Sequence, residues 1–362
     1  MIIFVVTIMK KRILVAPLNW GLGHATRCIP IIKALLQSGF IPVLASDSGS
    51  LLLLQKEFPE LEWVELPSYK IQYPEKGANF KLKMLWQLPK IWKAVRAERS
   101  QTEKIIKEYN LTGIISDNRL GVYSREIPSV ILTHQLNVLT GNTTWLSSKI
   151  HQAYIKNFDE CWVPDVQDMP NLSGKMGHVN HTKLPVKYIG ILSNLSKKKL
   201  PLVYDLMILL SGPEPQRSLI EKKLLEAVKE FKGTVLFVKG KVEAKQQILN
   251  EGHVSIYNFM TSTQIEQALN ESKLVIARSG YSTLMDLASL GKKAFLIPTP
   301  GQFEQEYLAE RLAKKQLLPG CRQDQFDISK LADIDTFHGI STLPVNNNLE
   351  DLFRLFEGKR KF

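Results

Sequence analysis

Cysteine and long apolar segments are both scarce in this sequence. Only three cysteines occur among 362 residues, and their spacing matches no metal-ligand pattern, so we expect neither a disulfide framework nor a zinc site. The first eight residues are apolar and are expected to form an irregular leader. No run reaches the ~18 apolar residues that a transmembrane helix needs. Low-complexity tracts are also lacking, so the sequence predicts a folded protein of the reducing cytoplasm that does not cross a membrane.

Acidic residues are in the minority, and the formal net charge is +12. This charge favours an anionic partner such as nucleic acid, a phospholipid surface or a nucleotide diphosphate. The basic residues are scattered and no nucleic-acid-binding motif occurs, so no nucleic-acid partner is expected. The segment from Lys81 to Lys93 mixes lysines with Leu, Met and Trp, a composition suited to a peripheral site on an anionic membrane surface, although Pro89 interrupts its helical pattern. A helix packed on a sheet has similar spacing and is the default interpretation.

Short runs rich in Val and Ile alternate with stretches of helical period along most of the chain. This alternation is typical of βαβ units with a parallel sheet. Strands are predicted at 13–16, 42–45, 63–66, 113–116, 129–132 and 160–163, and in a second series at 204–210, 234–238, 254–257, 274–277 and 294–297. We predict an α/β protein with two Rossmann-like domains facing each other across a cleft. The expected parts are residues 1–165, a linker at 166–187, residues 188–345, and a C-terminal helix at 346–362 that can pack back on the first domain.

The loop after the first predicted strand contains Gly21, Gly23 and His24 and leads into an apolar helix. Ligands of open α/β sheets bind beyond the carboxyl ends of the strands, so this loop is expected to face the cleft. The glycines let backbone approach a ligand, and a helix N-terminus presents free N–H groups to an anion. A histidine in this position suits general-base catalysis. A histidine that only caps the helix or packs against the loop is the alternative.

The pattern Gly-x-Gly-His-x-x-Arg at positions 21–27 resembles a loop of the inverting glycosyltransferases with the GT-B fold, especially glycosyltransferase family 28, which includes the peptidoglycan N-acetylglucosaminyltransferase. A second segment, at positions 278–283, follows a predicted strand and opens a helix, like the family segment Arg-Ser-Gly-x-x-Thr. The resemblance implies donor-binding roles for Arg278, Ser279, Gly280, Ser282, Thr283 and Asp286. Asp286 stands where the family usually has a longer Glu that binds the ribose hydroxyls.

Two more loops and one helix start extend the resemblance. Glu304 and Gln305 look like the pair that holds the donor sugar in the family, and a shift by one residue onto Gln305 and Glu306 is the alternative. The remaining implied donor contacts lie in a Ser-Gly loop and beside the expected nucleobase position: Ser211, Gly212, Phe259 and Met260. Two prolines in the Ser-Gly loop remove backbone donors and weaken a phosphate cradle there. The two apolar residues have core packing as their alternative.

On the acceptor side, Asp117, Asn118 and His134 follow predicted strands and are expected to point into the cleft. Some related glycosyltransferases have an Asp at about this separation that orients the base. The resemblance therefore makes Asp117 the candidate partner of His24, where a carboxylate would stabilise the imidazolium. An Asp that only caps the next turn is the alternative.

These features predict an inverting transfer of a sugar from a nucleotide diphosphate, with uridine as the expected nucleoside, to an acceptor hydroxyl. No Asp-x-Asp motif occurs in a donor loop, so no obligatory metal or other cofactor is expected. A membrane position of the segment from Lys81 to Lys93 would favour a lipid-linked acceptor. The strongest alternative is a nucleotide-sugar hydrolase of the same fold, because the hydrolase of pseudaminic acid synthesis has a similar loop that matches Arg27 and Cys28. A UDP-sugar 2-epimerase is a further alternative.

Overall fold

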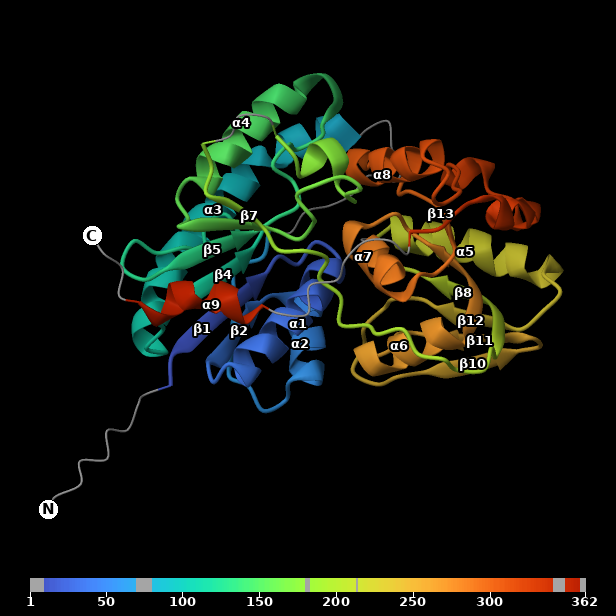
Figure 1. Cartoon of the computed structure of the whole chain (residues 1–362), viewed down its shortest axis with the longest axis horizontal. Helices are drawn as coiled ribbons and strands as arrows, with labels where there is room; N and C mark the ends of the chain where they lie inside the picture. The colour runs from blue at the N-terminus through green and yellow to red at the C-terminus, as the bar shows by residue number, and fades with distance from the viewer. Residues whose placement is uncertain (1–9, 70–79, 180–182, 213, 341–348, 359–362) are drawn as a thin grey trace, which may run out of the picture.

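The computed structural model describes residues 10–69, 80–179, 183–212, 214–340 and 349–358, apart from the side chains of residues 80–88. Two sheets lie side by side, each flanked by helices (Figure 1). The first sheet has the strand order β3-β2-β1-β4-β5-β6-β7, and the second has the order β10-β11-β9-β8-β12-β13. All pairings are parallel except that of β10 with β11. The structure therefore has the predicted α/β architecture.

The first domain is built on seven strands. They are β1 (Arg12–Pro17), β2 (Ile41–Ser46), β3 (Trp63–Glu65), β4 (Gly113–Asp117), β5 (Ser129–Leu132), β6 (Glu160–Val163) and β7 (Val186–Tyr188). Its helices are α1 (Gly23–Gln37), α2 (Ser48–Glu57), α3 (Phe80–Glu108) and α4 (Thr144–Ile155), with 3₁₀ turns η2 (Gly141–Thr143) and η3 (Gly174–Met176). The central strands β4 and β5 are buried along their whole length, as expected when both faces of a parallel sheet are covered by helices.

The second domain has six strands. They are β8 (Tyr204–Leu209), β9 (Val235–Val238), β10 (Ile248–Glu251), β11 (Val254–Tyr257), β12 (Ser272–Ala277) and β13 (Ala294–Leu296). The helices are α5 (Gln216–Ala227), α6 (Ser262–Glu271), α7 (Tyr281–Leu290) and α8 (Phe303–Lys314), with 3₁₀ turns η4 (Val228–Glu230), η5 (Gln323–Gln325) and η6 (Ile328–Thr336). The strand β10 was not predicted, because its residues are all exposed and carry no apolar pattern.

The first sheet extends beyond the boundary expected at residue 165. Strand β7 lies at the end of the predicted linker, but it pairs with β6 and completes the first sheet. The loop between these strands is organised by the buried Asp165, whose carboxylate accepts backbone N–H groups of Val166, Leu172 and Ser173. A loop held by one carboxylate has no periodicity, so the sequence pattern alone did not show that it belongs to the domain.

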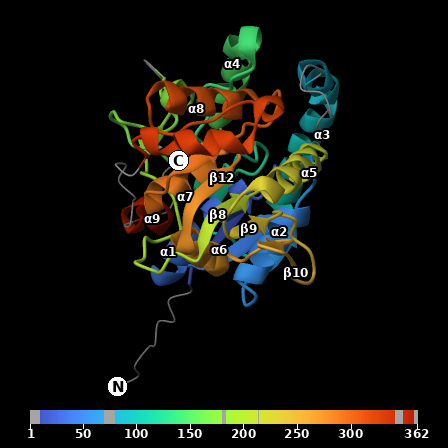
Figure 2. The same cartoon turned by 90° about the vertical axis from the view of Figure 1, so that its right-hand side faces the viewer.

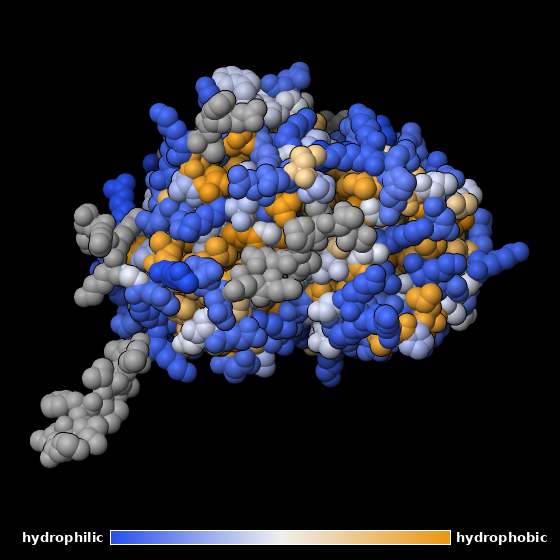
Figure 3. All heavy atoms as spheres, in the orientation of Figure 1, coloured by the Kyte–Doolittle hydropathy of each residue, from blue (hydrophilic) through white to orange (hydrophobic). Residues whose placement is uncertain are grey.

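Helix α3 runs through Pro89 without ending, contrary to the expected interruption. A proline removes one backbone hydrogen bond, but the helix is anchored further along by Val95 and Ile105, which are buried. Lys90 and Lys93 are exposed and Trp92 is 52% exposed, whereas the side chains of 81–88 lie outside the described part. Among the described residues, no helix has the length and apolar character needed to span a bilayer. Polar side chains cover most of the face shown in Figure 3, with apolar patches between them.

The C-terminal helix α9 (Glu350–Glu357) lies against the first domain (Figure 1). Phe353 is 1% exposed and packs edge-on against Phe40, with the ring centroids 5.9 Å apart. The ring centroids of Phe353 and Trp162 of β6 are 6.4 Å apart. A Cβ atom on Gly113 would overlap the ring of Phe356, so the glycine at the start of β4 makes room for this helix. The last described helix therefore returns to the domain in which the chain began.

Candidate functional site

The loops that follow strands of the two sheets meet between the domains (Figure 1). Figure 2 shows the molecule with the second domain in front. Ser282 Oγ of α7 donates to the backbone oxygen of Gly23 at 2.7 Å. A Cβ atom on Gly21 would lie only 4.0 Å from Gly212 Cα, across the domain boundary. Gly21 also has a φ of +87°, which favours glycine over residues with a side chain. The glycines of the first loop therefore allow the two backbones to approach closely.

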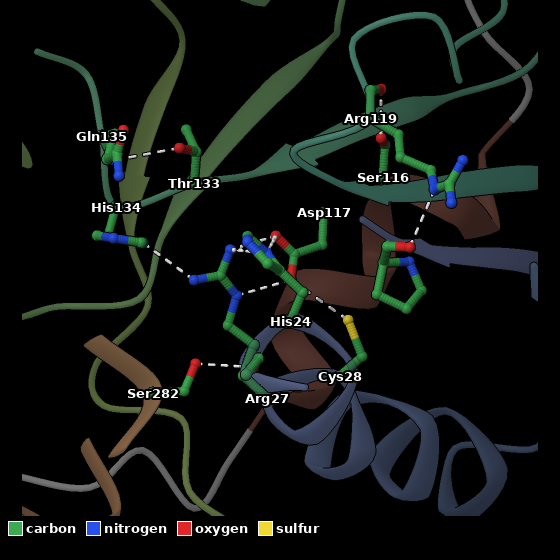
Figure 4. Close-up of polar contacts among 12 residues, drawn as sticks. His24, Arg27, Cys28, Ser116, Asp117, Arg119, Thr133, His134, Gln135 and Ser282 are labelled. Atoms are coloured by element: carbon green, nitrogen blue, oxygen red, sulfur yellow. Dashed lines mark hydrogen bonds and ion pairs between the residues drawn. The ribbon is translucent and has the colours of Figure 1, made fainter. Parts of the chain in front are cut away.

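His24 and Asp117 are neighbours at this boundary, although 93 positions separate them in the sequence. His24 Nδ1 lies 2.9 Å from Asp117 Oδ1 (Figure 4). Arg27, one turn further along α1, donates its Nε to Asp117 Oδ2 at 2.6 Å and its Nη2 to Oδ1. Burial alone would raise the pKa of Asp117, but the charges and hydrogen bonds of Arg27 and His24 outweigh it and hold that pKa well below its usual range. Asp117 is thus a buried, ionised carboxylate.

The partners of His24 indicate which of its nitrogens carries the proton. An ionised carboxylate only accepts hydrogen bonds, so the tautomer with Nδ1–H satisfies Asp117. Arg27 Nη2 also lies 2.9 Å from Nδ1, and it donates one of its two protons to Asp117 Oδ1, so in this tautomer the arginine and the imidazole both donate to the same carboxylate oxygen. Nε2 then keeps its lone pair, and the His24 side chain remains 15% exposed. This arrangement can accept a proton from a hydroxyl that reaches Nε2.

His134 bonds to Arg27 of its own domain and to Glu304 of the second domain. Its Nδ1 lies 2.9 Å from Arg27 Nη1, and its Nε2 lies 3.0 Å from Glu304 Oε1 of α8. A guanidinium only donates, so Nδ1 must accept and Nε2–H must donate to Glu304. His134 is therefore neutral, in agreement with the lowering of its pKa by burial. The ring also stacks on Tyr281 at the start of α7, with the centroids 4.0 Å apart.

Glu304 is the member of the predicted sugar-binding pair that faces the first domain. Its second carboxylate oxygen accepts a hydrogen bond from Gln135 Nε2. Gln305 is buried, and its side chain accepts the backbone N–H of Thr299 at 2.8 Å. Glu306 accepts a hydrogen bond from the backbone N–H of Gly301 in the same loop. Gln305 and Glu306 therefore shape the loop before α8, whereas Glu304 is presented to the first domain.

The helices α7 and α1 both begin at the boundary without a side-chain cap. Helix α7 follows Gly280, and its first turn, which includes Thr283, contains no acidic residue. Ser279 donates to the backbone oxygen of Gln305 instead of capping the helix. Helix α1 likewise begins at Gly23 with no acidic residue in its first turn. The leading N–H groups and the dipole of each helix favour an anion.

Arg278 is buried inside the second domain, although the resemblance implies a donor-binding role for it. It is 1% exposed, and its guanidinium donates to the backbone oxygens of Ile297, Pro298 and Gln216 and to the side chain of Gln323. Burial lowers the pKa of Arg278 to about 9. The guanidinium thus binds together loops within the second domain.

Asp286 lies in the middle of α7, and its carboxylate accepts a hydrogen bond from Ser193 Oγ at 2.7 Å. Ser193 belongs to the segment that joins the two sheets. Burial raises the pKa of Asp286 to about 7, and the hydrogen bond from Ser193 lowers it only in part. The predicted ribose contact is therefore a carboxyl group that is readily protonated near neutral pH.

The other predicted donor contacts lie in two loops of the second domain. Gly212 has a φ of +114° and open space where a Cβ atom would be, and Ser211 is half-buried beside it. Phe259 is buried, with its backbone N–H bonded to Asn258 and its backbone oxygen to Gln246. Met260 is also buried, so both apolar residues contribute to the core.

Several polar groups at the site were not predicted from the sequence. Arg27 and Gln135 contact the central cluster, as described above. Within the part of the chain that the structure describes, the buried oxygens Thr299 Oγ1, Gln302 Oε1 and Asn118 Oδ1 have no hydrogen-bond partner. Asn118 was predicted on the acceptor side, and its φ of +57° turns the chain sharply after Asp117. Among the described residues, no cluster of His, Cys, Asp and Glu could hold a metal ion.

Comparison with known proteins identifies the class. Residues 215–334 match the glycosyltransferase family 28 C-terminal domain. A stretch of 47 residues, 13% of this chain and 13% of the relative, is 40% identical to the UDP-N-acetylglucosamine--N-acetylmuramyl-(pentapeptide) pyrophosphoryl-undecaprenol N-acetylglucosamine transferase of Rhodopseudomonas palustris. The glycotransferase of kitacinnamycin aligns over 96% of this chain and 95% of its own length, with 14% identity and a TM-score of 0.61. MurG of Acinetobacter baumannii aligns over 91% of this chain and 92% of its own length, with 15% identity and a TM-score of 0.50.

These likenesses confirm the predicted fold: the chain has the GT-B fold of two Rossmann-like domains. Its second domain is similar to the glycosyltransferase family 28 C-terminal domain, which matches residues 215–334. The predicted resemblance to glycosyltransferase family 28 is thereby confirmed.

Proposed function

We propose that this protein transfers a sugar from a uridine diphosphate sugar to an acceptor hydroxyl with inversion at the anomeric carbon. The observation that carries the proposal is the His24–Asp117 pair, which lies at the domain boundary opposite the N-terminus of α7. A base on one domain and an anion seat on the other are the two elements that such a transfer needs.

His24 would act as the general base. Its Nε2 removes the proton of the acceptor hydroxyl while the hydroxyl oxygen forms a bond to the anomeric carbon. The bond from that carbon to the diphosphate oxygen breaks, and the nucleotide diphosphate leaves with the electron pair. Asp117 holds the ring orientation and offsets the imidazolium charge. Arg27 fixes the carboxylate by two hydrogen bonds.

The second domain would bind the donor. The uncapped N-terminus of α7 stabilises the departing diphosphate through its N–H groups, and Gly212 leaves space for it. Glu304 and the unpartnered oxygen of Gln302 suit hydroxyls of the donor sugar. Asp286 would take a ribose hydroxyl beside Ser193. Among proteins of similar structure, LpCGTa forms a complex with UDP and the rhamnosyltransferase SpnG one with thymidine diphosphate, which supports a nucleotide diphosphate donor.

The test is to incubate the protein with several nucleotide sugars, with and without glycan and lipid acceptors, and to follow nucleotide release and product mass. Acceptor-dependent release, lost in His24→Gln, supports the transferase. Acceptor-independent release would identify a hydrolase, and a changed sugar on an intact nucleotide would identify an epimerase. Inversion is checked by the anomeric configuration of the product, and retention would contradict the proposed single displacement.

A further inference from the structure

His134 lies within a continuous series of hydrogen bonds that crosses the domain boundary. It connects Glu304 of α8 to Arg27 of α1. Arg27 in turn holds the carboxylate of Asp117, which is bonded to His24. Figure 4 shows the Arg27 guanidinium between the His134 ring and Asp117. The side chain that the proposed function assigns to the donor sugar is therefore joined to the proposed base by side-chain hydrogen bonds.

The orientation of the His134 ring is fixed by stacking as well as by hydrogen bonds. The ring is buried and lies against that of Tyr281, the first residue of α7, with the two planes 1° from parallel. The Tyr281 hydroxyl donates to the backbone oxygen of Pro164 in the first domain at 2.9 Å. Rotation of either ring would break a hydrogen bond, so both nitrogens of His134 stay directed at their partners.

Glu304 belongs to a face of α8 that contacts the first domain (Figure 1). Tyr307 and Arg311 follow Glu304 at helical spacing and lie on the same face. Tyr307 Oη accepts the backbone N–H of Lys175 at 3.0 Å. Arg311 Nη2 donates to the side-chain and backbone oxygens of Asn171. A shift of α8 would therefore change the hydrogen bonds that Glu304 makes to the first domain.

The series also brings a second negative charge near the base. The charges of Asp117 and Arg27 largely cancel, because the two groups form a buried ion pair. Burial alone would raise the pKa of Glu304, but its interactions with His134 and with the groups beyond it outweigh burial and lower that pKa. Ionised Glu304 can thus offset the charge of the imidazolium that His24 becomes when it takes the acceptor proton.

We propose that His134 is a positioning residue that couples the donor-sugar site to the general base. While the second domain presents Glu304, the imidazole keeps its proton on Nε2, and its Nδ1 accepts from Arg27 and holds the guanidinium against Asp117. His24 is thus aligned when the two domains are engaged and a donor sugar at Glu304 faces the acceptor. This inference rests on the proposed glycosyltransferase function and adds to it a residue that acts through Arg27.

The first experiment separates the two nitrogens of the His134 ring. An asparagine oxygen takes roughly the place of Nδ1 and can accept from Arg27, whereas a glutamine nitrogen takes that of Nε2 and can donate to Glu304. If the two bonds act as one unit, His134→Asn, His134→Gln and His134→Phe should each lower kcat by about 10- to 100-fold, with the donor KM within about threefold of the parent. Parental kcat in His134→Asn or His134→Gln would overturn the coupling, because one bond would then suffice.

Two further variants show whether the loss passes through the base. Tyr307→Phe removes another hydrogen bond between α8 and the first domain; as the matched control it should keep kcat within about threefold of the parent. Adding His134→Phe to His24→Gln should slow the reaction no more than about threefold further, since a residue that acts through His24 contributes little once His24 is replaced. A fully additive loss would contradict the proposal.

The second experiment needs no turnover and follows the imidazole nitrogen resonances of His24 by NMR, assigned by their loss in His24→Gln. Glu304→Gln should shift these resonances in the parent protein, and the shift should vanish when His134→Phe is also present. No shift in the parent, or the same shift in both backgrounds, would overturn the coupling. Failure of the general function is recognised separately, as a lack of UDP binding and of nucleotide-sugar turnover in the parent. Each variant is first checked for parental thermal unfolding.

Discussion

Asp117→Asn should nearly abolish catalysis, and the structure indicates the reason. The Asp117 carboxylate is shared between His24 and Arg27. In the variant the single carboxamide oxygen would be taken by the guanidinium, which can only donate, leaving the amide NH2 group to face His24 Nδ1. An NH2 group favours the ring tautomer with Nε2–H, and that tautomer cannot accept a proton from the acceptor hydroxyl.

Asp117→Asn should lower both catalysis and stability, and each loss has its own size. Loss of general-base catalysis lowers kcat by roughly 100- to 10,000-fold. The side chain of Arg27 is 2% exposed, and removing the charge partner of a buried ion costs about 3–5 kcal/mol of stability. A control is Asp47→Asn, which removes one of the two carboxylates that pair with the buried Arg119, the other being Glu98, away from His24. It should lose less stability than Asp117→Asn, because Arg119 keeps Glu98, and keep kcat within about threefold of the parent.

The assay is single-turnover kinetics with saturating donor, combined with urea unfolding and UDP calorimetry. If Asp117 acts through His24, the double variant with His24→Gln should be no more than about threefold slower than His24→Gln alone. A fully additive loss would show that Asp117 acts independently of His24. A folded Asp117→Asn variant with the kcat of the parent would refute the tautomer argument.

Three other predictions test the electrostatics, the packing and the surface of the molecule. Because the pKa of Asp286 is raised from 3.8 to about 7, its ionisation opposes folding, and stability should fall as the pH rises through that interval. Asp286→Asn should therefore stabilise the protein by on the order of 2 kcal/mol at pH 8 and change little at pH 4 in urea titrations; equal effects at both pH values would contradict the assigned shift. Phe353→Ala should cost about 3–5 kcal/mol of stability in the first domain, whereas Arg354→Ala on the exposed side of α9 should stay within about 0.5 kcal/mol. Lys90→Glu with Lys93→Glu should reduce sedimentation with anionic vesicles but not with neutral ones, and unchanged sedimentation would leave α3 as an ordinary surface helix.

The sequence alone determined the class of fold and the location of the main loops. Alternating strand and helix patterns predicted most strands of both sheets, because buried parallel strands are short apolar runs and the helices between them have a different period. The glycine loop with His24 and the turn before α7 were also recognisable, since strand, turn and helix chemistry is local. Asp117 was named as the partner of His24 from the family resemblance, and the structure brings it there because it ends β4, which pairs with β1.

Other features were decided only by the tertiary structure. Arg27 bonds Asp117 and His134, and His134 bonds Glu304 at a separation of 170 residues. No local pattern records such contacts, because they exist only once the two sheets face each other. The same holds for Arg278. Its sequence motif implied a donor-binding role, but its guanidinium donates to carbonyl oxygens of distant segments that the fold brings next to it. Local order is set by residues near in sequence, whereas hydrogen-bond partners of buried charges are set by which distant segments pack together.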